Sequence, residues 1–131
     1  MHEIHKRDKV KEVFHITDND GRELTVESVL DPGEALPAWN RAKNSIIRAQ
    51  IAKQPDFEAL GRAIVDVFAV FFGEDGAAKI LDFYGGNYTD MMEDVFPYIE
   101  SILLPKLEAE SAKRREAVMN LYRSRSRRRK L

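Results

Sequence analysis

The chain has 131 residues, a formal net charge of −1 at pH 7 and no cysteine. This length fits one domain that can fold without a metal or a disulfide, and the lack of cysteine excludes thiol redox chemistry and thiolate metal sites. The N-terminus has no apolar stretch of signal-peptide length, and the longest apolar run, Val67 to Phe72, falls far short of the ~20 residues that cross a bilayer. We therefore expect a soluble protein that is neither secreted nor bound to a membrane.

The charge is unevenly divided along the chain. Nine lysines and arginines against one glutamate give residues 113–131 a charge of +8, which leaves −9 on residues 1–112. A basic end on an acidic body can guide a partner electrostatically, and a block of like charge is also typical of a solvated tail.

The N-terminal third predicts a β-hairpin. Residues 1–9 are mixed and charged, and we expect them to be loose. Apolar and polar residues alternate over residues 10–16 and 22–30, and the segment between them, 17–21, contains the Asp, Asn and Gly that favour a tight turn. An isolated hairpin is marginal in water, so its apolar face must cover another element.

Two helices are expected next. Residues 31–34 predict a turn, and Pro37 can occupy the first position of a helix that continues to about Gln54. Asp56 is placed to cap a second helix. That helix is apolar nearly all round as far as Phe72, which is typical of a helix in the centre of a domain.

Glycines and prolines divide the rest of the helical region. Gly73 is expected to end the central helix, and a short helix follows as far as the glycine pair at 85–86. A final amphipathic helix begins near residues 87–90. Pro97 lies within its apolar stripe and should kink or split it.

The C-terminal region has helix-forming residues but a thin apolar face. From Glu108 onward we expect a helical extension that only a partner would fully order, followed by disorder over residues 124–130. The basic tail consists of Arg123, Arg125, Arg127, Arg128, Arg129 and Lys130.

The predicted fold is therefore mainly α with an N-terminal β-hairpin (α+β). Residues 1–9 form a flexible N-terminus, residues 10–107 form a single domain of the hairpin and about four helices, and residues 108–131 form the charged extension with its basic tail.

We expect no metal site, no cofactor and no catalytic centre. Four residues match positions of the calcium-loop pattern: Asp18, Asp20, Gly21 and Glu27. The first ligand position would be Ile16, which cannot coordinate, so a plain hairpin turn is preferred. His2 and His5 lie in the loose N-terminus without the partners that orient metal ligands. No Ser/His/Asp or paired-carboxylate arrangement can be placed on one face, which favours a protein that is not an enzyme.

The central segment carries a family resemblance. Residues 63–80 have the sequence Ala-Ile-Val-Asp-Val-Phe-Ala-Val-Phe-Phe-Gly-Glu-Asp-Gly-Ala-Ala-Lys-Ile, and a Gly-Gly-Asn turn follows at 85–87. Together with the hairpin that leads into Asp-Pro-Gly-Glu-Ala at 31–35, this resembles the tail-assembly chaperones of long-tailed bacteriophages and prophages. The likeness covers residues 10–104. The chain departs from the family pattern where Asp75 is inserted before a glycine, and in its long basic tail.

The resemblance implies a non-catalytic assembly factor. Such chaperones bind the tape-measure protein, a long, helical, aggregation-prone rod, keep it soluble and help tail-tube proteins gather round it. They act in the cytoplasm of the bacterial host and are absent from the mature virion. The amount of apolar helix surface in this small chain also favours self-association into a homo-oligomer.

We interpret two rows of apolar residues as a groove for helical segments of the rod. The rows are Phe68, Phe71 and Phe72, and Met91, Met92 and Phe96. The alternative interpretation is that these side chains only fill the core.

Two other functions remain open on the sequence alone. The first is a small nucleic-acid-associated regulator that acts through the Arg/Ser-rich tail, although a general attraction to phosphates is all that such a tail predicts. The second is a structural head–tail connector, which would be found in purified virions.

Overall fold

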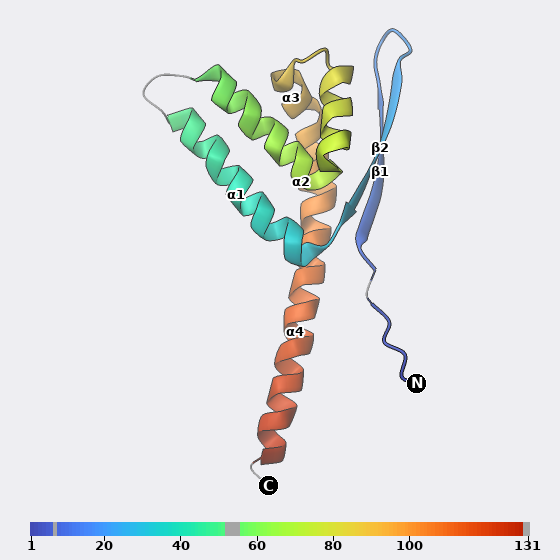
Figure 1. Ribbon diagram of the computed structural model, residues 1–131, viewed down its shortest axis with the longest axis vertical. Helices are drawn as coiled ribbons and strands as arrows, with labels where there is room; N and C mark the ends of the chain where they lie inside the picture. The colour runs from blue at the N-terminus through green and yellow to red at the C-terminus, as the bar shows by residue number, and fades with distance from the viewer. Residues whose placement is uncertain (7, 52–55, 130–131) are drawn as a thin grey trace.

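The computed structural model describes residues 1–6, 8–51 and 56–129 and confirms the predicted fold class (Figure 1). In chain order the elements are β1 (Val10–Thr17), β2 (Glu23–Leu30), α1 (Pro32–Ile51), α2 (Phe57–Phe83), α3 (Tyr88–Tyr98), the π-helical segment η1 (Ile99–Leu103) and α4 (Leu104–Arg129). α1 packs against α2, the hairpin lies on the other side of α2, and α4 extends well beyond the rest of the molecule.

The hairpin forms as predicted. β1 and β2 are antiparallel, with Phe14 opposite Val26. The Asp18 carboxylate accepts hydrogen bonds from the backbone N–H groups of Asp20 and Arg22, both at 2.9 Å, and Gly21 adopts a φ of 83°. This carboxylate therefore holds the turn, as the sequence interpretation required, and the apolar face of the hairpin packs on α2.

α1 begins earlier than predicted. Residues 32–34 belong to the helix, because Pro32 takes its first position, where no backbone N–H is needed. The Asp31 carboxylate accepts from the backbone N–H of Gly33 at 3.0 Å. Pro37 lies inside the helix, where the missing hydrogen bond would have gone to the carbonyl of the exposed Gly33. The described part of α1 ends at Ile51, so the predicted end near residue 54 lies outside the described residues.

α2 is the central helix, and it breaks at Gly73 as predicted. Its N-terminus is capped by Asp56, whose carboxylate accepts from the backbone N–H of Ala59 at 3.0 Å. Gly73 has φ 75° and ψ 169°, a conformation that is essentially restricted to glycine. The helix resumes beyond it and ends before the glycine pair at 85–86, both with positive φ.

A buried serine ties the hairpin to this break. In a continuous helix the carbonyl of Phe71 would accept from a residue one turn later, but the non-helical backbone at Gly73 interrupts that pattern. The hydroxyl of Ser28, on β2, donates to this carbonyl at 2.5 Å, and Ser28 is fully buried. The hairpin thus supplies a hydrogen-bond donor to a backbone carbonyl beside the break in α2.

The last helical region is continuous but contains a widened turn. The irregularity predicted at Pro97 appears directly after it, as η1, where the N–H of Leu104 donates to the carbonyl of Ile99, five residues back. Pro105 follows, and its ring would clash with a carbonyl at ordinary α-helical spacing, so the wider turn accommodates it.

α4 differs from the prediction at its C-terminal end. We predicted disorder over residues 124–130, whereas the backbone is helical to Arg129, and Lys130 lies outside the described residues. Arginine is a good helix former, so the run extends a helix whose first turns are already fixed by the buried Leu103 and Leu107. Within the described residues, no helix is long and apolar enough to span a membrane.

Candidate protein-binding site

Four of the six predicted groove residues lie in the core. Phe68, Phe71, Phe72 and Met91 are buried. Phe72 packs against Phe68 and, edge to face at 5.6 Å between ring centroids, against Phe14 of the hairpin. The prediction that these four side chains line a binding groove was therefore wrong. They are covered by α1, by the hairpin and by the helices after residue 88.

The other two, Met92 and Phe96, remain partly exposed and line a shallow cavity of about 300 Å³. We call this cavity the α1/α3 groove. Its lining residues are Trp39, Lys43, Ile46, Ile47, Met92, Phe96, Glu100 and Leu104. They come from α1, α3, η1 and the start of α4, so the groove exists only when these elements are assembled.

An aromatic chain forms the floor of the groove and connects it to the core. The ring of Trp39 lies 5.7 Å from that of the buried Phe71 and 5.6 Å from that of Phe96. The ammonium group of Lys43 lies 5.9 Å from the centroid of the Trp39 ring, within the range of a cation–π contact. Each ring of the floor therefore packs against the next.

The walls and rim are more adaptable. Met92 has a flexible thioether side chain that can fit varied apolar shapes. Ile47 is 45% exposed, and Ile51, one turn further along α1, is also exposed, so the apolar surface continues beyond the groove. Lys43 and Glu100 are the charged lining residues. The groove can bind apolar side chains, and its lysine and glutamate can pair with acidic or basic residues of the bound segment.

No residue of α1 was predicted to line the groove. Trp39, Ala42 and Ile46 recur at helical spacing and form an apolar stripe along this helix, and the role of Ile47 was missed. Ile47 directly follows Ile46 and falls off that stripe. An isoleucine beside a helical stripe is the one sequence signal that could have indicated an exposed apolar wall on this element.

Polar groups elsewhere have structural roles. Among the described residues, no cluster of three or more His, Cys, Asp or Glu side chains could hold a metal ion. On the hairpin, His15 Nδ1 lies 2.9 Å from the Thr25 hydroxyl, and His15 Nε2 lies 3.7 Å from the Glu23 carboxylate. These exposed contacts link neighbouring strands.

An ion pair connects the middle of α4 to the start of α1. Arg114 Nη1 donates to the Asp31 carboxylate at 3.0 Å. The hydrogen bond from the Gly33 backbone N–H, followed by that from Arg114, lowers the pKa of the Asp31 carboxyl below its ordinary value. Lys106 of α4 also pairs with Glu12 of β1.

The basic tail projects away from the groove. Arg123 is exposed on α4. The backbone carrying Arg125, Arg127, Arg128 and Arg129 is helical, and Lys130 lies outside the described residues. The structure therefore does not bring the tail and the α1/α3 groove together (Figure 1).

No protein-family model, curated protein or solved structure matches the chain. The α1/α3 groove and the projecting basic helix are therefore the structural features that bear on function.

Proposed function

We propose that the protein is a non-catalytic tail-assembly chaperone of a long-tailed bacteriophage or prophage. Its α1/α3 groove would bind amphipathic helical segments of the tape-measure protein and keep that protein soluble while tail-tube subunits are recruited. The observation that carries the proposal is the groove itself, with an aromatic floor, a methionine wall and a rim of one cation and one anion. The protein would act in the host cytoplasm and leave before the virion matures.

The geometry suits helix-in-groove recognition. An amphipathic helix presents apolar side chains every three or four residues, and a short groove receives one such set at a time. Met92 allows different side chains to fit, which a chaperone for a long rod of varied sequence requires. Lys43 and Glu100 can pair with acidic and basic residues that flank the apolar positions.

The size of the groove favours reversible binding. Each apolar side chain that it buries contributes about 1.5–3 kcal/mol, and the ordering of the bound segment offsets part of this gain. A cavity of about 300 Å³ holds few such side chains. Individual contacts should therefore form and break readily, as required of a factor that must release its client.

A matched pair of exposed substitutions tests the proposal. Ile47 lines the groove and is 45% exposed, whereas Val29, on the outer face of β2, is 44% exposed. Ile47→Asp and Val29→Asp therefore introduce the same charge at equally accessible β-branched positions. Each variant is co-expressed with the tape-measure protein of the same phage, and the soluble fraction of that protein is measured.

We expect Ile47→Asp to reduce the soluble fraction about tenfold or more, which corresponds to loss of a central apolar contact. Val29→Asp should match the wild type, and circular dichroism should show both variants folded. Equal solubilisation by the two folded variants would exclude the groove as the client site.

A second candidate function follows from the projecting basic helix. α4 extends beyond the body, and residues 113–131 carry +8. Such a helix could attract nucleic acid through its phosphates. This function predicts a steep salt dependence of binding to random-sequence DNA that disappears when residues 123–131 are removed, with the Ile47→Asp variant binding as the wild type does.

A further inference from the structure

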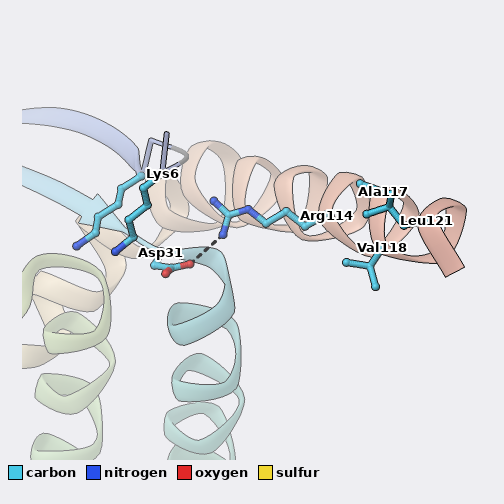
Figure 2. Close-up of a pocket in the computed structure, with 7 residues that line it drawn as sticks. Lys6, Asp31, Arg114, Ala117, Val118 and Leu121 are labelled. Carbon is cyan, nitrogen blue, oxygen red and sulfur yellow. Dashed lines mark hydrogen bonds and ion pairs between the residues drawn. The ribbon is translucent and has the colours of Figure 1, made fainter. Parts of the chain in front are cut away.

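The projecting part of α4 carries an apolar strip. Val118 and Leu121 lie one turn apart and are 64% and 67% exposed. With Ala117 they line an open hollow of about 380 Å³ that Lys6, Lys9, Asp31 and Arg114 complete. Figure 2 shows Arg114 turned towards Asp31 and the three apolar side chains further along the helix. We call Ala117, Val118 and Leu121 the α4 strip.

The charges around the strip define what could cover it. Arg114 is paired with Asp31, but Lys6 and Lys9 also line the hollow and the helix beyond residue 112 is strongly basic. Two such strips placed face to face would bring like charges together, which opposes a symmetric pairing of α4 helices. The occupant must be apolar and carry negative charge.

The chain itself contains a surface of that kind. A hollow of about 460 Å³ lies over the first turns of α2. Its lining residues are Phe57, Glu58, Gly61, Arg62, Val65, Asp66, Leu81 and Tyr88. We call it the α2 hollow. It contains two carboxylates against one guanidinium, and it belongs to the part of the chain that carries −9.

Contacts between α2 and α3 form part of the α2 hollow. The Tyr88 hydroxyl donates to the carbonyl of Phe57 at 3.1 Å. The ring of Tyr88 packs directly over Gly61, where an added Cβ would lie 3.0 Å from a ring carbon. The side chain of Phe57 is mostly exposed beside this contact. The hollow is therefore a formed apolar surface with acidic surroundings.

The two surfaces lie on different parts of the molecule. In Figure 1 the first turns of α2 are near one end of the long axis, whereas the α4 strip lies beside Asp31, next to the start of α1, where α4 leaves the body. A rigid helix cannot turn back to reach the hollow of its own chain, so contact between the two surfaces must join separate copies. The net charge of −1 presents little overall repulsion between copies.

We propose that the α4 strip of one copy docks into the α2 hollow of a second copy, head to tail. Such a contact uses different surfaces on the two partners, so it leaves one free strip and one free hollow on every dimer. Further copies can add at both ends, giving open chains or closed rings. This inference is independent of the proposed function, because it uses neither the α1/α3 groove nor a client protein.

Analytical ultracentrifugation of the full chain over rising concentration tests the contact. The mass of the wild type should increase beyond that of a dimer, and the association should weaken as salt screens the charges. Leu121→Gln should weaken it about tenfold or more. Met119→Gln is the matched control, since it also replaces an exposed apolar side chain of the same helix with glutamine, about 160° round from Leu121.

A mixture of two variants, one altered in the strip and one in the hollow, distinguishes a head-to-tail contact from other modes of association. Phe57→Gln should weaken self-association as Leu121→Gln does, while Ile51→Gln, also at an exposed apolar position, should not. An equimolar mixture of the Leu121 and Phe57 variants retains one intact strip and one intact hollow. It should form dimers with nearly wild-type affinity that do not extend further.

Two results would overturn the proposal. The first is a wild-type chain that stays monomeric at about 1 mM, where even a weak contact is populated. The second is a mixture that associates no better than either variant alone, which would show that the strip does not bind the α2 hollow. Circular dichroism of each variant establishes that loss of association is not loss of folding.

Discussion

Replacing Ser28 with alanine should destabilise the protein through a single backbone carbonyl. The Ser28 hydroxyl donates to the carbonyl of Phe71 at 2.5 Å, and the serine side chain is fully buried between β2 and α2. The break at Gly73 removes the carbonyl from the regular helical pattern. Without the hydroxyl, the carbonyl is buried and lacks this donor. A buried polar group left unsatisfied costs about 1–3 kcal/mol.

This cost can be expressed as a shift in melting temperature. The entropy of unfolding is roughly 2.1 cal/mol/K per residue, so 131 residues give about 0.28 kcal/mol/K. A loss of about 1–3 kcal/mol therefore corresponds to a fall of roughly 4–11 °C in Tm. Differential scanning calorimetry of the wild type and of Ser28→Ala measures this shift directly.

Ser45 provides the control within the same chain. Its hydroxyl also donates to a backbone carbonyl, that of Arg41 at 3.3 Å, but on the exposed face of α1. Because water can replace that bond, Ser45→Ala should change the free energy of unfolding by less than about 0.5 kcal/mol. If Ser28→Ala and Ser45→Ala had the same Tm, the hydrogen bond from Ser28 to the carbonyl of Phe71 would contribute no measurable stability, and the reasoning would be refuted.

Three further substitutions probe the elements that position the candidate site. Gly73→Ala forces a side chain into a conformation that only glycine adopts readily and should cost about 1–3 kcal/mol in urea denaturation; an unchanged midpoint would contradict the need for glycine. Asp56→Ala removes the cap of α2 and should cost about 0.5–2 kcal/mol by the same assay, whereas Asp56→Asn should retain most of the stability. The Gly33 N–H and Arg114 lower the pKa of Asp31 below 3.8, so the charged form stabilises the fold above that pH and the benefit is lost as the pH falls through the folded value. Asp31→Asn should therefore be less stable than the wild type at pH 7, with a difference that shrinks below pH 3.8, and a difference independent of pH would contradict this contact.

The sequence predicted those parts of the fold that depend on local chemistry. The Asp-rich turn of the hairpin, the cap at Asp56 and the break at Gly73 each depend on a residue type with a distinct backbone preference. The start of α1 was predicted wrongly at Pro37, because Pro32 can also occupy a first helical position and does so in the structure. The contact between the Asp31 carboxylate and the following turn decides between them, and only the structure shows it.

The candidate site was harder to predict because the apolar pattern of one helix does not show which of its faces other helices and strands will cover. Met91 and Met92 are neighbours of the same residue type, yet Met91 is fully buried and Met92 lines the groove. The difference depends on α2, against which α3 packs, and on Trp39 and Ile47 of α1, which line the groove with Met92 from 53 and 45 residues earlier in the chain. Long-range packing of this kind leaves no mark in the local pattern.

The two proposals predict a combined behaviour that neither predicts alone. A head-to-tail chain would display many α1/α3 grooves in a row, and a long client that occupied several of them would be held about 10²–10⁴-fold more tightly than by one. Leu121→Gln leaves the groove intact, so it should lower solubilisation of the tape-measure protein together with the mass of the assembly. Ile47→Asp should lower solubilisation while the mass stays that of the wild type. If Leu121→Gln abolished assembly and left solubilisation unchanged, each groove would act singly, and the weak binding inferred from its small volume would be insufficient to explain the activity.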